Sequence, residues 1–469
     1  QTCALPISQA PDLVFLKDTN GDGKADVRQR VIHGLDSADT HHTANSFAMD
    51  PGGAVYFQEG TFHHTQVETP FGAPWRCANG GVFRYEPKSQ KFEVYVTFGF
   101  ANPHGHVFDK WGQDIVVDGT GAVPYHGTLF SGFLPFPNKH NRPPTVYRQR
   151  TRPCPGMEYV SSEHFPEEFQ GNLLVANVIG FQGILRYKVS DKGASFDAEE
   201  LEPILSSTDP NFRPSDLKFG PDGALYFIDW HNPIIGHMQH NLRDPSRDRE
   251  HGRIYRVTCE GRPLQKSPKI AGVPTEELVG LLAHPVDRVR ALVRLELGGR
   301  DAAGVEKALR GWTASKPAGD RAHLEALWVM QHLNEPRADM LKAVLGGPDF
   351  HSRAAAVRVL CAWRDRIPDV VDLLKTLAGD EHPRVRLEAV RAASWVNKAE
   401  AVEVPIIAGA KGQDEFVDFV RGETMRTLDP LYKEALARGE KVVFTSDAAQ
   451  RYLLKSLSVE ALLKEPRDR

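Results

Sequence analysis

The sequence has few cysteines, no long apolar run and almost no excess of charge. Its 469 residues include five cysteines, and no two of them form a Cys-x-x-Cys pair, which excludes a zinc ribbon, a dithiol redox pair and a haem-attachment site in this chain. No apolar run approaches the length that spans a bilayer, so we expect no transmembrane segment here. A formal net charge of −4 argues against nucleic acid and anionic membranes as partners.

Three of the cysteines, Cys77, Cys154 and Cys259, lie in the first half of the chain. One disulfide among them stays an open alternative, but we expect free, buried thiols. Residues 1–10 show no strand pattern and resemble translated sequencing-adapter sequence. We therefore leave them out of the expected fold, and we expect the natural protein to begin further upstream.

The composition changes near residues 259–275. Aromatic residues, Gly and Pro crowd the sequence before this point, whereas Ala, Leu, Val, Arg and Glu dominate after it. Fourteen of the 19 histidines also precede it, so any imidazole chemistry belongs to the first half. A chain of this length is too long for one ordinary core. The predicted parts are a β-propeller over 11–258, a linker over 259–274, helical repeats over 275–429 and further helices, expected to be truncated, over 430–469.

A phrase recurs three times in the first half, over residues 40–57, 102–117 and 213–227. Each copy reads as a polar cluster, a short strand, a Gly-containing turn and a second strand. The first strands of successive units start about 55 residues apart, which is close to the period of a four-stranded propeller blade. We therefore expect about four and a half blades of a six-bladed, N-terminally truncated propeller, with the polar clusters converging around one axis.

Helical periodicity replaces this pattern after residue 275. Ala-centred helices are predicted over 290–297, 323–333, 353–363, 386–396 and 419–428. Their regular spacing is typical of a HEAT-like solenoid, which is all-α and stacks short helical pairs. Its Arg and Glu faces are either solvated surface or a docking surface for a protein partner.

The histidine pair His41-His42 is the first candidate for chemistry. It lies just before a predicted inner strand, where propeller side chains reach the central channel. A neutral imidazole there could take a proton from a substrate hydroxyl group. The alternative is a histidine that bonds to a neighbouring loop.

Two further polar clusters open later blades. Asn102 precedes a proline, which holds it in an extended turn and would suit a donor to a carboxylate or quinone oxygen, with His104 beside it. The alternative for Asn102 is an Asx turn. Arg213 offers a planar fork to a carboxylate, and with Asp216 it could instead form an ion pair between blades.

The loop from Asp18 to Asp26 has the pattern Asp-x-Asn-x-Asp-Gly-x-x-Asp. Closely spaced oxygen ligands around a Gly turn suit Ca²⁺, so Asp18, Asn20, Asp22 and Asp26 are predicted to bind a structural calcium ion. The twelfth residue of the loop is Gln29 rather than Glu, which excludes an EF-hand. A later insert with His231, His237 and His240 has spacings that match no standard metal site.

At these residues the chain resembles the large dehydrogenase-like proteins of planctomycetes and verrucomicrobia, which are described as membrane-bound dehydrogenases with a c-type haem domain. The resemblance covers about residues 11–258 well and the helical half more loosely. The propeller of that family is in turn similar to soluble quinoprotein glucose and sorbosone dehydrogenases, six-bladed enzymes that use pyrroloquinoline quinone with Ca²⁺. The matching phrases are Asp18–Asp26, Thr40–Thr43, Asn45–Phe47, Phe181–Gly183, Asp229–His240 and Gly252–Arg256.

The resemblance implies a quinoprotein-type enzyme that oxidises a sugar or another alcohol. His42 would correspond to the general base, with His41 in the place of that family's Asp. Asn102 and Arg213 would hold the quinone, although the Arg that precedes the Asn in those enzymes is here Ala101. Electrons would pass to a c-type haem domain that this chain lacks. The protein would be periplasmic, membrane-associated or secreted.

Two other functions stay open from the sequence. The propeller and solenoid could form a non-catalytic scaffold that binds a glycan or a protein, because propellers serve many functions. A Ca²⁺-dependent propeller hydrolase or lactonase is the third hypothesis. It would need carboxylates at the strand starts, where this sequence has mainly His and Asn.

Overall fold

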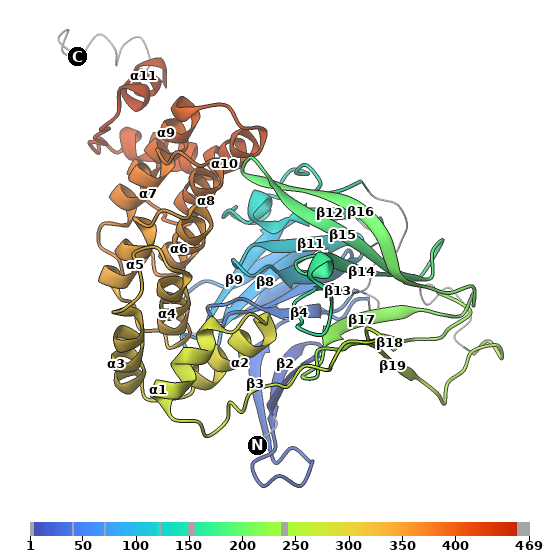
Figure 1. Cartoon of the computed structure of the whole chain (residues 1–469). Coiled ribbons are helices and arrows are strands. Elements are labelled where there is room, and N and C mark those ends of the chain that lie inside the picture. Colours follow the sequence, from blue (N-terminus) through green and yellow to red (C-terminus); the bar gives the residue numbers. More distant parts are fainter. Residues whose placement is uncertain are drawn as a thin grey trace.

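The computed structural model describes residues 4–39, 42–69, 72–119, 121, 123–148, 156–235 and 243–456. Antiparallel sheets occupy the N-terminal half, and a column of stacked helices runs along one side of them (Figure 1). The predicted division between a β half and a helical half is therefore confirmed. No helix among these residues is long and apolar enough to cross a membrane.

The described β half contains five sheets of three or four strands and one separate hairpin. The first sheet is β1 (Ala4–Gln9), β2 (Asp12–Lys17) and β3 (Val27–His33). The second is β4 (Asn45–Met49), β5 (Val55–Glu59), β8 (Gly81–Glu86) and β9 (Lys91–Thr97), with the hairpin β6 (His64–Val67) and β7 (Trp75–Ala78) inserted. The third is β10 (Pro103–Phe108), β11 (Asp114–Asp118) and β12 (Val123–His126). The fourth is β13 (Met157–Tyr159), β14 (Leu173–Asn177), β15 (Gly183–Lys192) and β16 (Ser195–Ser206), and the fifth is β17 (Pro214–Phe219), β18 (Leu225–Asp229) and β19 (Arg253–Val257).

The recurring phrase forms the first hairpin of three sheets, as predicted. Its turn joins β4 to β5, β10 to β11 and β17 to β18. In each turn an aspartate, Asp50, Asp109 or Asp222, accepts a hydrogen bond from a backbone N–H further along the turn. This local bond explains why the phrase repeats, since it closes the same turn each time.

The first strands of successive sheets lie next to one another. Strand β10 contacts both β4 and β13, and β13 contacts β17. This is the arrangement of propeller blades around an axis, and it places the residues that precede these strands at a common end.

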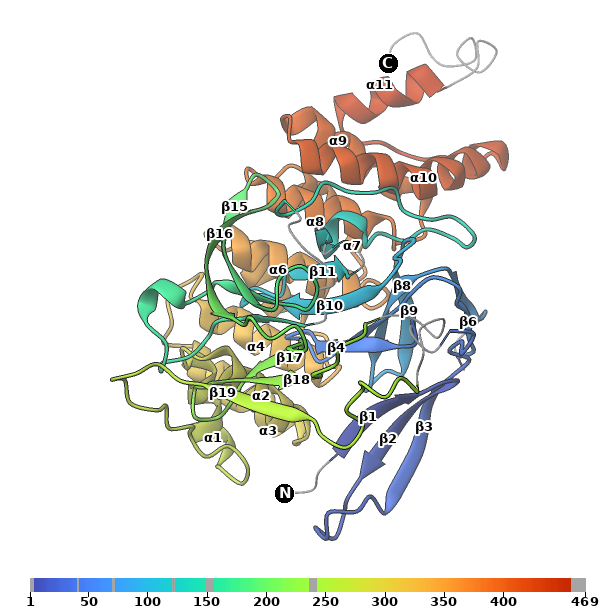
Figure 2. The same cartoon turned by 90° about the vertical axis from the view of Figure 1, so that its right-hand side faces the viewer.

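The helical half is built from antiparallel pairs, seen side by side in both views (Figure 2). The helices that match the predicted Ala-centred segments are α2 (Asp287–Gly298), α4 (Arg321–His332), α6 (Phe350–Ala362), α8 (Pro383–Ala393) and α10 (Glu415–Ala437). Their partners are α1 (Thr275–Leu278), α3 (Ala302–Thr313), α5 (Ala338–Leu345), α7 (Val370–Ala378), α9 (Glu403–Lys411) and α11 (Asp447–Ser456). The short 3₁₀ helices are η1 (Gly127–Phe130), η2 (Glu167–Phe169), η3 (Val279–Ala283) and η4 (Ala399–Val402).

Two boundary predictions were wrong. Residues 4–9 form β1, which pairs along its length with β2, although no strand was expected there. An edge strand needs only one hydrogen-bonded neighbour and so can form without an alternating apolar pattern. The predicted boundary at 429–430 falls inside α10, because Pro430 lies within that helix.

The sheets and the helices share one apolar core. Side chains of the second and third sheets, such as Tyr95 and Val116, belong to the same buried cluster as Leu282 and Val357 of the helical half. The predicted linker 259–274 also lies against the last sheet, where Gln265 N–H donates to the carbonyl of Asp222. The two halves therefore form one packed body.

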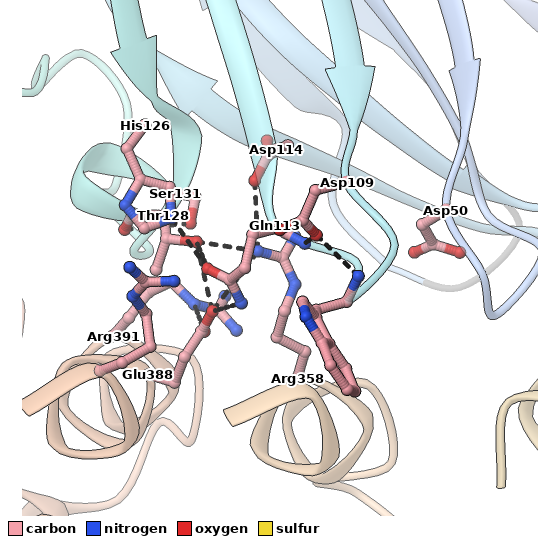
Figure 3. Close-up of polar contacts among 12 residues, drawn as sticks. Asp50, Asp109, Gln113, Asp114, His126, Thr128, Ser131, Arg358, Glu388 and Arg391 are labelled. Carbon is pink, nitrogen blue, oxygen red and sulfur yellow. Dashed lines mark hydrogen bonds and ion pairs between the residues drawn. The ribbon is translucent and has the colours of Figure 1, made fainter. Parts of the chain in front are cut away.

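A buried polar network joins the third sheet to the helices (Figure 3). The Arg358 guanidinium on α6 donates from Nη1 to Asp114 Oδ1 at 3.2 Å and to Thr128 Oγ1 at 2.8 Å, and from Nη2 to the Tyr95 hydroxyl at 2.9 Å. It also lies 3.5 Å from Glu388 Oε1 on α8. Burial alone would raise the pKa of Asp114, but Arg358 and a hydrogen-bonded histidine hold that pKa well below its usual value.

Glu388 is the second centre of this network and is fully buried. Its Oε1 accepts from Gln113 Nε2 at 2.9 Å and from Thr128 Oγ1 at 3.2 Å, while its Oε2 accepts from Arg391 Nε at 2.9 Å. Gln113 Oε1 in turn lies 2.8 Å from His126 Nε2. Each carboxylate oxygen therefore has a partner, which is the condition under which a buried charge is tolerated.

Removal of one charge from this network should be costly. We expect Arg358→Met to lower the free energy of unfolding by about 3–5 kcal/mol, because it leaves Asp114 buried without its main counter-charge and removes one of the two arginines beside Glu388. Urea denaturation of the full chain measures the loss. Lys307→Met on the exposed side of α3 is the matched control, and a loss for Arg358→Met no larger than for this control would contradict the proposed role of the network.

Stability should also depend on pH through a buried histidine. His140 bonds to the Thr97 carbonyl and the Gly132 carbonyl, and burial lowers its pKa to about 4. Because the unfolded chain takes up a proton near pH 6.5, the free energy of unfolding is highest above that pH. It should fall by about 3 kcal/mol on this account between pH 6.5 and 4.

Denaturation at a series of pH values, compared between the wild type and His140→Gln, measures this contribution. The variant should show a shallower decline, whereas His64→Gln, at an exposed histidine on β6, should follow the wild type. An identical slope for all three proteins would assign the pH dependence to other groups.

Candidate functional site

Two of the predicted site residues meet at the starts of β4 and β10. The His42 Nε2 atom lies 2.6 Å from Asn102 Oδ1, although the two residues are 60 positions apart in the sequence. The His42 side chain is only 1% exposed. The sequence prediction that these polar clusters converge is therefore confirmed for this pair.

Two aspartates that the sequence analysis missed hold the pair in place. Asp39 Oδ2 lies 3.6 Å from His42 Nδ1, on the opposite side of the ring from Asn102. The Asp118 carboxylate accepts hydrogen bonds from the backbone N–H groups of Ala101 and Asn102, at 3.1 and 3.0 Å. Asp39 lies three residues before His42 in the sequence. This spacing could have indicated Asp39, instead of His41, as the partner of His42.

Unusual backbone geometry occurs at the same end of the sheets. Ser46, Phe62 and His231 adopt positive φ angles of 54°, 71° and 43°. Such conformations cost non-glycine residues about 1–3 kcal/mol each and often accompany functional sites. Ser46 Oγ accepts from Gly105 N–H at 2.8 Å, linking β4 to β10. The Phe62 ring, which is 59% exposed at residue level, lies 6.0 Å from the His42 ring.

The other histidines of these clusters have different placements. His41 lies outside the described residues. His104 is half-buried and lies against Gly119, where an added Cβ would come within 3.3 Å of the His104 Cδ2 atom. His104 therefore packs beside the pair, while its predicted role as a cofactor ligand stays a prediction. His237 and His240 also lie outside the described residues.

Arg213 and Asp216 occupy separate positions. The Arg213 guanidinium is buried and donates to two backbone carbonyls, from Nε to Asn232 at 2.9 Å and from Nη1 to Val178. Burial lowers the pKa of Arg213. Asp216 is exposed, and its Oδ1 accepts from the N–H of Leu217 at 2.8 Å. An ion pair between them, the alternative for this cluster, is not among the contacts of the described residues.

These contacts decide how well the residues fit a quinone cofactor. The resemblance assigns Asn102 and Arg213 to pyrroloquinoline quinone, an acidic, planar molecule. The Arg213 guanidinium already donates to the backbone of two loops, and the Asn102 amide already contacts His42. The described residues therefore do not fit the quinone in the way the resemblance implies, and no reaction step is derived through it.

The predicted calcium loop is closed by its own hydrogen bonds. Asp18 accepts from Gly21 N–H at 2.6 Å and from Gly23 N–H at 3.0 Å. The bond from Gly21 holds the pKa of Asp18 below its usual value. Asn20 Oδ1 accepts from Asp22 N–H at 3.0 Å. These are Asx-type turns, in which side-chain oxygens satisfy nearby backbone donors.

The last carboxylate of the loop is used in the same way. Asp26 accepts from both the backbone N–H and the hydroxyl of Thr19, the latter at 2.5 Å. Within the part of the chain that the structure describes, no three His, Cys, Asp or Glu side chains lie close enough together to hold a metal ion. The side-chain oxygens of this loop therefore close turns, and their role as Ca²⁺ ligands stays a prediction.

Two of the three cysteines considered for a disulfide are free thiols. Cys77 is buried and Cys259 is partly buried. Burial raises the pKa of Cys77 to about 11, which leaves it unreactive at neutral pH. Cys154 lies outside the described residues.

Comparisons with known proteins follow the two halves of the structure. The pattern of a domain of unknown function, DUF7133, matches residues 4–145 and 141–261. The pattern of HEAT repeats matches residues 338–417. No curated protein matches the sequence significantly.

Several solved structures align over about half of the chain. A luciferin-regenerating enzyme shares 15% identity over 56% of this chain and 76% of its own, with a TM-score of 0.35. A glucose dehydrogenase shares 14% identity over 55% and 77%, with a TM-score of 0.34. Virginiamycin B lyase shares 13% over 55% and 82%, with a TM-score of 0.27. Likenesses this distant carry no argument about function.

The loop geometry makes a prediction about calcium. We expect Asp18→Ala to lower the unfolding midpoint by a few degrees, because two backbone N–H groups lose their acceptor. An excess of EGTA distinguishes turn closure alone, which leaves the wild-type midpoint unchanged, from Ca²⁺ binding. Differential scanning calorimetry with and without EGTA measures both effects. A drop in the wild-type midpoint on chelation, absent in Asp18→Ala, would show instead that the loop binds an ion.

Proposed function

The chain belongs to the DUF7133 family, and we propose that it oxidises the hydroxyl group of a sugar or another alcohol at the site formed by His42 and Asn102. The observation that carries this proposal is the 2.6 Å contact between these two residues, with Asp39 on the other side of the His42 ring. A base flanked by an orienting group is the common arrangement for proton abstraction from a hydroxyl group.

The chemistry of the pair follows from its hydrogen bonding. Both ring nitrogens of His42 face oxygens, Asn102 Oδ1 and Asp39 Oδ2. Two facing oxygens suit the protonated ring, which is the state His42 reaches after it takes a proton. Amide oxygen and nitrogen are assigned from such contacts. A half-turn of the Asn102 amide would present its NH₂ group to Nε2 instead. In either orientation a substrate hydroxyl group must replace the Asn102 contact to give its proton to Nε2.

Access to His42 requires a neighbouring side chain to move. Phe62 is the candidate, because its ring lies beside His42 and its backbone is held at a positive φ. A ring that is largely exposed loses little packing when it swings away. We propose that substrate displaces Phe62 and brings its hydroxyl group to His42.

The carbon-bound hydrogen must leave with two electrons. We propose that the hydride passes to a diffusible quinone that Asn102 and Arg213 do not hold, with a c-type haem protein as the next electron carrier. A periplasmic or secreted location would suit both. Asp39 and Asn102 orient the His42 ring during this transfer, since each of them faces one of its ring nitrogens.

A second candidate function is binding without catalysis. It is favoured by the 1% exposure of His42, which is also the burial of a purely structural histidine. In this case the His42 and Asn102 contact would simply join two neighbouring sheets. Activity measurements separate the two candidates.

We expect His42→Ala to lower kcat by about 10²–10⁴-fold, the usual contribution of a general base. Asn102→Ala should give a smaller loss, and His64→Ala, at an exposed histidine on β6, should retain full activity. Dye-coupled oxidation of a panel of sugars and alcohols, with added pyrroloquinoline quinone or a soluble benzoquinone, measures the rates. Wild-type inactivity across the panel would favour the binding function. Full activity of a folded His42→Ala protein would contradict the role of His42 as the base.

A further inference from the structure

Two adjoining cavities lie between the sheets and the helices, at the opposite ends of the first strands from His42. The larger has a volume of about 1240 Å³ and the smaller about 650 Å³. Asp109, Lys110, Tyr159, Ser161 and Asp287 line both of them. Because the two cavities share these lining residues, they lie side by side, and we call them together the interface cleft.

The two parts of the interface cleft carry opposite charge. Seven carboxylates line the larger cavity, against three Lys or Arg residues. Six Lys or Arg residues line the smaller cavity, against three carboxylates. Such segregation gives the cleft a negative and a positive end, and charge arranged in this way selects partners of complementary pattern.

The positive end is built on three arginines that share one buried glutamate. Glu325 lies 3.2 Å from Arg290 Nε, 2.6 Å from Arg294 Nη1 and 3.1 Å from Arg321 Nη2. Burial and the neighbouring Arg321 lower the pKa of Arg290 to about 10. One glutamate cannot balance three guanidinium groups. Among the residues that the structure describes, one further carboxylate pairs with them, which is Asp287 at Arg290.

The rim of this positive end adds further cations. Arg288 and Lys110 are both exposed, and neither has an ion pair within 4 Å among the residues that the structure describes. Lys218, also exposed, pairs with Glu158 at 3.1 Å. The excess of positive charge therefore faces the cleft and is available to an incoming acidic group.

The negative end has a matching excess. Glu163, Glu167, Glu168 and Glu199 are exposed and line the larger cavity. Within the described ranges none of the four has an ion pair, whereas Asp191 at the same wall is balanced by Arg384 at 3.1 Å. Four uncompensated glutamates make this end suited to a basic group.

We propose that the interface cleft binds an extended polypeptide segment of another protein, with an acidic stretch in the smaller cavity and a basic stretch in the larger one. A polypeptide is the ligand class that carries both signs of charge in a fixed order along one chain. The proposal is independent of the chemistry at His42, because the cleft uses a different end of the sheets.

The cleft is prepared for such a partner before it binds. Its walls come from both halves of the molecule, and the polar network around Arg358 and Glu388 fixes these halves against each other. A site that needs no rearrangement loses less free energy on binding. Because charge supplies the selectivity, binding should weaken as salt screens the interaction.

Labelled peptides of matched composition test the charge order. One peptide carries four glutamates followed by four lysines, and the other alternates the same residues. We expect the block peptide to bind the full chain at least about tenfold more tightly than the alternating one, with the difference lost in 0.5 M NaCl because the Debye length falls to a few ångströms. Fluorescence polarisation measures both affinities.

Three variants locate the binding site. Arg288→Glu at the positive end and Glu168→Lys at the negative end should each weaken binding of the block peptide about fivefold or more. Lys307→Glu, on the exposed side of α3, is the control and should bind as the wild type does. Thermal unfolding confirms that each variant is folded.

Three outcomes would overturn the proposal. They are equal affinity for the two peptides, unchanged binding by both cleft variants, and no binding of either peptide at low salt. Tighter binding of an acidic oligosaccharide such as hexagalacturonate than of the block peptide would also overturn it, because that ligand carries charge of one sign only.

Discussion

The buried ion network around Arg358, Asp114 and Glu388 is the constraint on which the rest of the structure depends. It holds residues that are more than 200 positions apart in the sequence at hydrogen-bonding distance. The apolar core is continuous across the same boundary. The helices are therefore part of the same folded unit as the sheets. The interface cleft keeps its shape because this network and the shared apolar core fix one half against the other.

The His42 site and the interface cleft lie at opposite ends of the first strands of the sheets. The residues before β4 and β10 bring His42 to Asn102, whereas the turns after these strands face the helices. A substrate at the first end and a partner at the second would therefore not compete for space. Strands β4 and β10 each have a residue of the His42 and Asn102 pair before them and an Asp-containing turn after them, so the two features repeat together along the chain.

Local patterns were predictable and long-range contacts were not. The recurring phrase gave the hairpins because Asp50, Asp109 and Asp222 close their turns within a few residues. The meeting of His42 and Asn102 followed from the same repeat. Residue spacing did not predict that Arg213 donates to distant backbone carbonyls, because this depends on the folded chain. It also did not predict that N–H groups of the Asp18 loop bond to the Asp18 carboxylate, because this depends on the local backbone geometry. Strand β1 was missed because an edge strand needs a neighbour rather than a pattern.

There is a physical reason why buried charged side chains, and not apolar side chains alone, join the sheets to the helices. Buried charges gain little net stability, since the cost of removing them from water offsets their attraction. A solenoid of similar helices, however, offers several similar apolar ridges, and an apolar interface alone could settle with the column shifted by one repeat. Such a shift would separate Asp114 from Arg358 and Glu388 from Gln113, at a cost of several kcal/mol. The network thus selects one docking position, and the opposed charges of the cleft are aligned as a consequence.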